Sequence, residues 1–523
     1  MSIGEFIYKN KEEIINVVND YIGKITSEYY KDVYFISNPV LTRNPFASSL
    51  IIKFAFNLKN KDNSICRLSS ITLGKKLFKY YLRNLISFLF FLFHFFSFQL
   101  SKLRFNSNKI DFNEDLIVIN TFTMIDKILP NSGFNDPFFG NIYEILSKMG
   151  KQYVLLCILF GDKKYNLRRR WQTYNILAGD RRDFITEFEL LTFFDYIRIL
   201  WFIFFYPFIA LKLLKVKISD LYDNAFKNEI INTLDRTESL NYVRYLAGKR
   251  LKKISNGKIN IISWYENQEI DKLLFRGLRD SNASCYIYGC QFFPKYPLWL
   301  NPYPLEIEKK HDVLPDEILV SGKFYLNGGS MVNYKKGMSP RYSYLFNFNC
   351  DCDNLKRRDS IAILLTYSIE ESRNIIKIVS DSKIDENNNE IYIKLHPNHL
   401  LNNPGFELPD KWISTNERLE DICRKSKVVI SACSGTILEA TSMGCSSIVI
   451  GDKRGLTFNP MPDIGKGEMW DVVFDSSELG SAYEKIINFR EKNLERIIEL
   501  SKIYKDSFFY ESNEENFIKC FNL

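Results

Sequence analysis

The sequence predicts an α/β protein of two domains, each built on a parallel β-sheet. Three observations support this prediction. The chain has 523 residues, which is too long for one hydrophobic core. Short apolar runs alternate with helical patterns in both halves of the chain. Two polar motifs in the second half directly follow such runs, where parallel sheets bind their ligands.

The first domain is expected over residues 1–330. Its apolar runs read as buried strands at 116–120, 152–160, 259–264, 284–288 and 318–321. The segment 141–149 has a helical pattern, so the first two strands and this helix predict a βαβ unit. The extra N-terminal part begins with a helical pattern, and the stretch 32–41 that follows it is predicted to be a strand.

The second domain is expected over residues 359–523, after an interdomain region at 331–358 that has little periodicity. Strands and helices alternate regularly in it, and a charged helical segment, 479–508, ends the pattern. The predicted strands are 361–366, 391–395, 428–431 and 447–450, and the predicted helices are 370–380, 419–425 and 437–443.

Two apolar runs raise the question of membrane contact. Leu85 to Leu100 is an uncharged run of 16 residues, whereas a spanning helix needs about 20. The run 199–211 is shorter and contains Pro207. Both are expected to be helices that either pack in the core or lie in the membrane interface. Basic clusters lie next to these runs, as suits an anionic membrane face, although ordinary solvated surface explains them equally well.

Charge and cysteine usage limit the class of protein. The net charge is +8, from 70 basic and 62 acidic residues, which is not the composition of a nucleic-acid-binding protein. The ten cysteines form no CxxC pair, and the chain begins without the apolar core of a signal peptide. We therefore expect a cytoplasmic protein, peripheral at the inner membrane.

The first polar motif is the turn from Ser431 to Thr436, between a predicted strand and a predicted helix. Free N–H groups at a helix start bind phosphate, and Gly435 lets a ligand approach the backbone. The hydroxyls of Ser431, Ser434 and Thr436 add donors. However, Thr436 and Glu439 also form a capping-box pattern, which needs no ligand.

The second polar motif, Lys394 to Asn398, ends a predicted strand. Lys394, His396 and Asn398 are expected at its carboxyl end, and Pro397 fixes the direction of the chain there. A histidine donates to a phosphate oxygen or protonates a leaving group. We therefore predict that His396 takes part both in nucleotide binding and in the chemistry.

These two motifs together resemble those of GT-B glycosyltransferases that use CMP-activated sugars, such as bacterial sialyltransferases and Kdo transferases. The pairing is also similar to that of CDP-glycerol glycerophosphotransferases. The resemblance covers residues 360 to 452. It implies two Rossmann-like domains facing a central cleft, with His396 and the 431–436 turn at the phosphates and Glu439 near the ribose. It also implies no metal and no cofactor other than the nucleotide-sugar co-substrate.

A pair of carboxylates, Glu266 and Asp271, follows the strand predicted at 259–264. Glycosyl transfer needs a carboxylate that deprotonates the acceptor hydroxyl or attacks the anomeric carbon. Trp264 and Tyr265 precede Glu266, and their rings are candidates for stacking on a sugar. The alternative is that these carboxylates only cap a helix. Weaker candidates are the turns at 43–45, 136–137 and 328–330, with Asp136 a possible base.

The sequence, with this resemblance, thus predicts an enzyme that transfers a sugar, a CMP-activated acidic sugar, to a surface polysaccharide or lipopolysaccharide. Its expected partners are a nucleotide-sugar donor and a glycan or glycolipid acceptor. Two alternatives stay open: a phosphotransferase that uses CDP-glycerol or CDP-ribitol, and a non-catalytic polysaccharide assembly factor.

Overall fold

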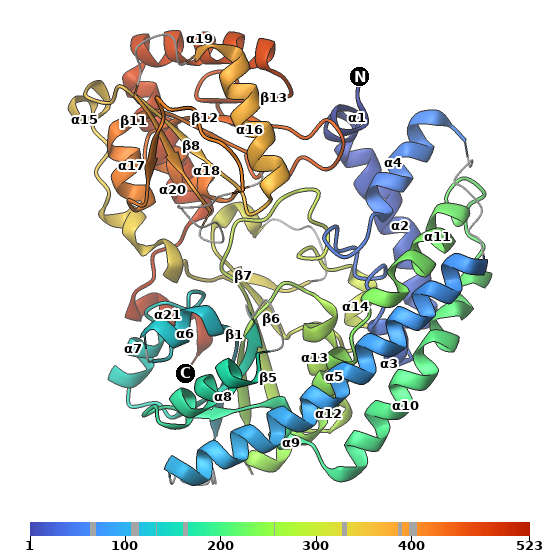
Figure 1. The fold of residues 1–523 in the computed structure, drawn as a ribbon. Helices are drawn as coiled ribbons and strands as arrows, with labels where there is room; N and C mark the ends of the chain where they lie inside the picture. Colours follow the sequence, from blue (N-terminus) through green and yellow to red (C-terminus); the bar gives the residue numbers. More distant parts are fainter. Residues whose placement is uncertain are drawn as a thin grey trace.

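Two parallel sheets, each covered by helices, form the two domains seen at the bottom and top of Figure 1. The computed structural model describes residues 1–62, 70–105, 115–131, 133–160, 166–255, 257–326, 332–384, 390–396, 405–432 and 434–522. In both sheets the strands alternate with helices along the chain. The fold class predicted from the sequence, two Rossmann-like domains of the GT-B kind, is therefore confirmed.

The sheet of the first domain has seven strands in the order β3-β2-β1-β4-β5-β6-β7. Its pairs are parallel; Val118 of β1, for example, faces Val154 of β2 and Ile261 of β4. The strand order reverses between β1 and β4. The strands are β1 (Leu116–Met124), β2 (Tyr153–Phe160), β3 (Asp183–Ile185), β4 (Ile259–Trp264), β5 (Cys285–Gln291), β6 (Glu317–Val320) and β7 (Tyr334–Lys336).

The sheet of the second domain has six strands in the order β10-β9-β8-β11-β12-β13. It is also parallel, with Val429 of β11 facing Ala362 of β8 and Ser447 of β12. Here the order reverses between β8 and β11. The strands are β8 (Ser360–Leu364), β9 (Ile391–Lys394), β10 (Ile413–Thr415), β11 (Ser426–Ser431), β12 (Ser446–Ile450) and β13 (Trp470–Val473).

Helices of the first half of the chain cover the first sheet, whose strands are apolar on both sides, and also pack on one another at the N-terminal end of the chain. They are α1 (Ile3–Lys9), α2 (Lys11–Tyr29), α3 (Val33–Ile36), α4 (Leu50–Asn60), α5 (Ser70–Phe105), α6 (Ile125–Asn131), α7 (Ile142–Lys148), α8 (Leu167–Ala178), α9 (Glu187–Leu190), α10 (Phe193–Ala210), η1 (Leu211–Lys215), α11 (Asp223–Thr233), η2 (Leu234–Arg236), α12 (Ser239–Leu251), η3 (Lys252–Ile254), α13 (Glu269–Asp280), α14 (Glu306–Lys309) and η4 (Lys323–Tyr325).

The remaining helices belong to the second half of the chain. They are η5 (Pro340–Asn347), α15 (Cys352–Lys356), α16 (Ile369–Ser382), α17 (Leu419–Lys425), α18 (Thr436–Ser442), α19 (Ser476–Lys492), α20 (Leu494–Phe508) and α21 (Glu514–Phe521).

The end of the chain returns to the first domain. In Figure 1 the C terminus lies beside α6 and α7. Phe517 and Phe521 of α21 are fully buried in the core that includes Ile119 of β1, and Tyr288 Oη of β5 donates to the carbonyl of Phe521 at 2.6 Å. The segment predicted as the second domain, 359–523, therefore includes a helix that packs on the first sheet.

One predicted strand is wrong. The stretch 32–41 forms the short helix α3 followed by turns. The Asp32 carboxylate caps this helix by accepting from the Tyr34 N–H at 3.0 Å, and the Asn38 side chain accepts from the Val40 N–H in the following turn. These local side-chain bonds outweigh the strand preference of its β-branched and aromatic residues.

Helices α5 and α10 contain the two apolar runs found in the sequence. Both are long and apolar enough to cross a membrane, by length and composition only. One face of α5 packs on the first domain, where Tyr80, Asn84, His94 and Ser101 are buried. The opposite face is exposed, so the run is only partly in the core.

Candidate functional site

The carboxyl ends of β1, β2 and β4 border a cavity of about 820 Å³ in the first domain. This edge lies where the strand order reverses, the place at which open α/β sheets bind their ligands. Charged and amide side chains line the cavity together with aromatic rings. They include Phe122, Phe138, Arg170, Arg236, Glu238, Asn241, Glu266 and Gln268.

Glu266, predicted from the sequence, lies in this cavity just after β4. Its Oε1 accepts from Trp264 Nε1 at 3.0 Å, and its Oε2 accepts from Gln268 Nε2 at 2.6 Å. Burial raises the pKa of the Glu266 carboxyl, while these two hydrogen bonds lower it. Desolvation makes a carboxylate a stronger base, so the site suits proton removal from a hydroxyl.

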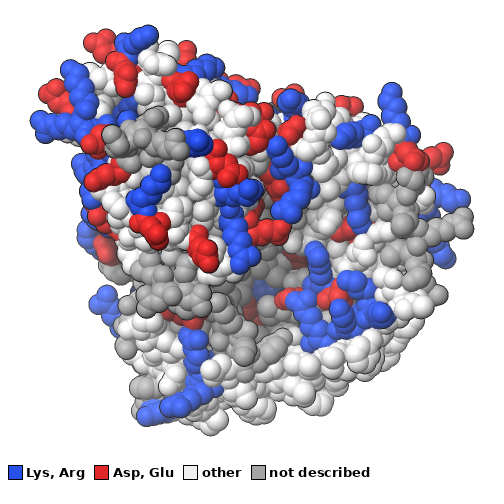
Figure 2. All heavy atoms as spheres, turned by 45° about the horizontal axis from the view of Figure 1, so that its top comes forward, with Lys and Arg blue, Asp and Glu red and all other residues white. Residues whose placement is uncertain are grey.

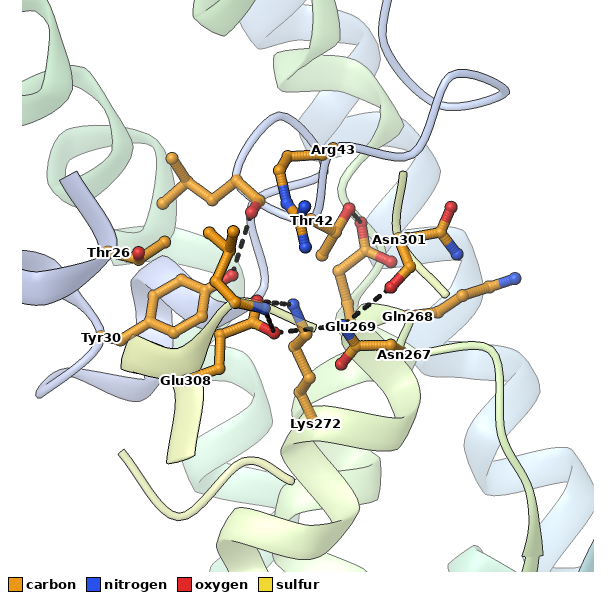
Figure 3. A network of polar contacts seen from close by, with 12 residues as sticks. Thr26, Tyr30, Thr42, Arg43, Asn267, Gln268, Glu269, Lys272, Asn301 and Glu308 are labelled. Carbon is orange, nitrogen blue, oxygen red and sulfur yellow. Dashed lines mark hydrogen bonds and ion pairs between the residues drawn. The ribbon is translucent and has the colours of Figure 1, made fainter. Parts of the chain in front are cut away.

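A buried polar network holds the loop that carries Glu266, and Figure 3 shows Asn267, Lys272, Asn301 and Glu308 of this network. Asn267, at the left-handed φ of 57°, donates to the Asn301 carbonyl at 2.8 Å and to Glu308 at 3.1 Å. Glu308 also pairs with Lys272 of α13 at 2.5 Å, and both side chains are fully buried. In return, Asn301 Nδ2 donates to the Glu266 carbonyl at 2.7 Å. The backbone at Glu266 is therefore rigidly placed.

Asp271 does not reach the cavity. Its Oδ2 accepts from the backbone N–H groups of Glu266 and Gln268 at 3.2 and 3.1 Å, which caps α13. Burial, followed by the nearby charge of Glu266, raises the pKa of Asp271 to about 7. Of the predicted pair of carboxylates, Glu266 thus faces the cavity and Asp271 caps a helix. Helix capping was the alternative role that the sequence left open for both.

Trp264 and Tyr265 are not placed to stack on a sugar. Both are buried, at 2% and 0% exposure. The Trp264 ring packs between Phe138 and Phe293, and Tyr265 Oη donates to Asn267 at 2.9 Å. Both side chains point into the core. The sequence at these two positions does not by itself show whether a ring points into the core or into a cavity.

The second domain has its own cavity, of about 620 Å³, at the carboxyl ends of β8, β11 and β12. It again lies at the reversal of strand order, between β8 and β11. Sequence reasoning missed the polar residues that line it. They are Ser368, Glu370, Glu371, Asn374, Asp452, Lys453, Arg454 and Thr457.

Two signals in the sequence point to this second cavity. Ser368 caps α16 by accepting from the Glu371 N–H, an S-x-x-E pattern directly after a strand. Gly451 and Asp452 follow β12, and Thr457 Oγ1 accepts from the Asp452 N–H at 3.1 Å. Burial raises the pKa of Glu371. Half-buried carboxylates of this kind are suited to hydrogen bonds from hydroxyl groups of a ligand.

The turn predicted to bind phosphate lies beside this cavity. Ser431 is fully buried and its hydroxyl donates to the Leu364 carbonyl at 2.9 Å, so it ties β11 to β8. Ser434 and Thr436 are partly exposed, and their hydroxyls lie 2.5 Å apart at the start of α18. Gly435 precedes the helix without a side-chain cap. Among the described residues of this turn, only those from 434 to 436 remain open to a ligand.

The other predicted donor-side residues lie apart from this turn. Glu439, a turn into α18, is buried and accepts from Tyr344 Oη, and burial raises its pKa. Lys394 of β9 is directed to the Glu417 carbonyl. His396 is half-buried, with its ring centroid 6.3 Å from that of Tyr367. β8 lies between the strand of His396 and β11. Asn398 falls outside the described residues.

Several contacts, including the following three, join the two domains. A methyl group built on Gly435 would lie 3.3 Å from Pro294 Cγ and 3.4 Å from Tyr296 Oη, so this turn faces the loop after β5. Phe46 stacks on Phe458 with ring centroids 5.1 Å apart. The Gly4 N–H donates to the Lys453 carbonyl at 3.0 Å. Figure 2 shows the surface hollowed between the domains, with Lys and Arg side chains along one border.

The weaker candidates are mostly structural. Arg43 is buried and donates to Asn19 Oδ1 and to the Tyr303 carbonyl. Asp136 accepts from Thr121, Tyr143 and the Phe138 N–H, and burial raises its pKa. The turn at 328–330 lies outside the described residues. Within the described residues, no group of three or more His, Cys, Asp or Glu side chains is placed to hold a metal ion.

Searches of family models and of curated proteins gave no match to this chain. Among solved structures, it is similar to UDP-GlcNAc 2-epimerase from Neisseria meningitidis bound to UDP-GlcNAc, at 10% identity and a TM-score of 0.42, covering 78% of this chain and 99% of that one. It is also similar to MurG from Acinetobacter baumannii, at 8% identity and a TM-score of 0.40, with the same coverage.

A third similar structure is the glycosyltransferase SnogD from Streptomyces nogalater, at 12% identity and a TM-score of 0.35, covering 75% of this chain and 95% of that one. At identities and TM-scores this low, the similarities carry no argument about what this chain binds. The fold assignment rests on the two sheets themselves.

Proposed function

We propose that the protein is a glycosyltransferase that moves a sugar from a nucleotide-sugar donor, a CMP-activated acidic sugar, to a hydroxyl of a bacterial surface glycan. One observation carries the proposal: each domain has a polar cavity at the reversal of its strand order, and the carboxylate of Glu266 faces one of them. This arrangement suits an acceptor in the first domain and a donor in the second.

On the acceptor side, Glu266 is the candidate general base. Its oxygens are held by Trp264 and Gln268, and its backbone by Asn301 and Asp271. A hydroxyl that enters the cavity would give its proton to this carboxylate while its oxygen attacks the anomeric carbon of the donor. The nucleotide leaves with the electrons of the broken bond. A base fixed in advance lowers the cost of reaching the transition state.

On the donor side, we place the nucleoside against the second cavity, with Glu371 and Asp452 available to ribose hydroxyls. The Ser434 and Thr436 hydroxyls and the N–H groups at the start of α18 are candidate phosphate donors. His396, after β9, would act from the far side of β8, where it would donate to the leaving phosphate. These placements combine residues predicted from sequence with residues that only the fold brings together.

A thermal-shift screen tests the donor class. CMP or CDP should raise the melting temperature, whereas UDP and GDP should have little effect, because a ligand that binds only the folded state stabilises it more as its concentration exceeds its Kd. Glu371→Gln should lower the shift with the favoured nucleotide without lowering the melting temperature of the free protein. Preference for UDP or GDP would assign another donor, and no shift with any of the four would contradict the proposal.

A further inference from the structure

An apolar surface on the first domain is formed by α5 and α10, which pack side by side in Figure 1. Tyr81 Oη of α5 donates to the Phe204 carbonyl of α10 at 3.1 Å, and Phe88 of α5 contacts Tyr196 of α10 with ring centroids 6.2 Å apart. Residue numbers rise along α5 as they fall along α10, so the two helices are antiparallel. We call their shared solvent side the α5–α10 face.

Large apolar side chains recur on this face every seven residues, which is every two helical turns. On α5 they are Leu82, Leu89, Phe96 and Leu103, exposed by 50%, 65%, 60% and 75%. This spacing keeps them on one line along the helix. On an ordinary protein surface, exposed apolar residues are scattered singly. A continuous stripe of this length is therefore unusual.

The same spacing recurs on α10, where Phe194, Trp201 and Phe208 are exposed by 69%, 57% and 65%. The Trp201 ring also stacks on the exposed Phe205, with centroids 4.9 Å apart. Aromatic rings, tryptophan above all, are enriched where proteins meet the interface of a bilayer. Two parallel apolar stripes therefore lie on neighbouring helices.

The exposed charges carried by the two helices themselves are all basic. α5 contains no Asp or Glu over its whole length. The single acidic residue of α10, Asp195, is buried and paired with Arg198 and Arg250. Because the helices are antiparallel, the exposed Lys75 and Lys79 of α5 lie toward the same end as the lysines that follow α10. These are Lys212, Lys215 and Lys217, all exposed.

We infer that the α5–α10 face docks on an anionic lipid bilayer, with both helices lying along its surface. The lysines complement the negative headgroups, and the apolar stripes enter the interface. The helices do not cross the bilayer, because one side of α5 is bound to the protein throughout. Asn84, for example, is buried and donates to the Thr237 carbonyl at 3.1 Å, and Ser101 is fully buried.

Docking in this orientation also suits the proposed function, on which this one point rests. A smaller cavity, of about 180 Å³, is lined by Arg83, Phe90 and His94 of α5. It shares Ile158 and Arg170 with the cavity that contains Glu266. The bilayer would thus lie against the helix that lines a cavity adjoining the acceptor side.

Sedimentation of the full chain with vesicles tests the docking. The protein should pellet with vesicles of phosphatidylcholine mixed with phosphatidylglycerol, and much less with phosphatidylcholine alone. Leu89→Gln with Phe208→Gln should reduce binding at least about tenfold, since two exposed apolar side chains that would enter the lipid interface are lost. Ile413→Gln, at an exposed apolar position on β10, is the matched control and should bind like the wild type.

The charge part of the proposal has its own variant. Replacing Lys75, Lys79, Lys212 and Lys215 by Gln should weaken binding to the anionic vesicles by about tenfold or more, and added salt should weaken binding of the wild type in the same way. Circular dichroism and melting temperature should be unchanged in each variant, because all these side chains are exposed. If a variant misfolds, the fluorescence measurement described below tests the proposal in its place.

Trp201 reports whether the face itself meets the lipid. Brominated lipids in the anionic vesicles should quench the fluorescence of the wild type, and Trp201→Phe should lose that quenching while it still pellets. The proposal is overturned if the wild type fails to pellet, if Trp201 is not quenched, or if Leu89→Gln with Phe208→Gln instead converts a soluble dimer to a monomer. None of these readouts depends on a nucleotide, so they are independent of the donor screen.

Discussion

The Asp271 carboxylate caps α13 from a fully buried position, and this gives a prediction for stability against pH. Its pKa is raised from 3.8 to about 7, first by burial. Its contribution to stability is therefore fully present below about pH 4 and is lost as the pH rises through 7. Asp271→Asn keeps an oxygen for the Glu266 and Gln268 N–H groups but cannot ionise. Relative to the wild type, its free energy of unfolding should rise between pH 5 and pH 8.

Urea denaturation of both proteins at the two pH values measures this difference, and the comparison cancels groups that titrate in both. A difference that stays constant with pH would show that Asp271 titrates normally. The same experiment separates a cap from a catalytic group, because Asp271→Asn should retain nucleotide binding and most of the transfer activity.

Substitutions of Glu266 and of His396 should affect nucleotide binding and turnover differently. Glu266→Gln keeps the hydrogen bond from Trp264, so the melting temperature and nucleotide binding should change little, while turnover falls by about 100-fold or more. His396→Ala should weaken nucleotide binding as well as transfer, because it removes a donor from the phosphate side. Calorimetric titration and a transfer assay measure the two effects. Full activity in Glu266→Gln would exclude this carboxylate as the base.

At the scale of elements, a buried ion pair joins Lys272 of α13 to Glu308 of α14, and Glu308 also accepts from Asn267 of the site loop. Burial lowers the pKa of Lys272, while the charge of Glu308 opposes that shift. Lys272→Met leaves Glu308 charged and without its main partner, which should cost about 3–5 kcal/mol. That is a large part of the stability of a domain, typically about 5–15 kcal/mol.

The double variant Lys272→Met with Glu308→Gln tests the reason for that loss. The neutral glutamine side chain can still accept from Asn267 and leaves no charge in the core, so most of the stability should return. Guanidinium denaturation of the wild type, the single and the double variant gives the comparison. If the double variant is less stable than the single one, the loss arises from packing and not from the stranded carboxylate.

At the scale of the whole molecule, the stack of Phe46 on Phe458 joins the domains beside both cavities. Asn44 and Ala47 line the first cavity and Phe458 the second. Phe46→Ala should remove the aromatic contact and with it about 0.5–1.5 kcal/mol of the free energy that holds the domains together. The Gly4 N–H, bonded to the Lys453 carbonyl across the domains, should then exchange hydrogen faster, while amides of β4 and β11 should be unaffected.

Hydrogen exchange with mass spectrometry measures both regions in one sample. Phe193→Ala, which removes an aromatic ring from an exposed position, is the control and should leave the Gly4 amide unchanged. Unchanged exchange in Phe46→Ala would mean that the other contacts between the domains hold them together without this stack.

The sequence by itself determined where the central strands lie and which loops follow their carboxyl ends. β4, β8, β9 and β12 match the predicted positions closely, because strands buried on both faces need unbroken apolar runs. Glu266 was found for the same reason, since a polar residue directly after such a run must lie at the sheet's edge.

Only the tertiary structure decided what each polar side chain touches. Ser431 and Asp271 match binding or catalytic patterns, yet their hydrogen bonds go to Leu364 and to the cap of α13. Glu371 and Asp452 follow different strands and meet at one cavity only because β8 and β12 flank β11. Local patterns record burial and turn preference, whereas partners far apart in the chain are set by strand order and packing.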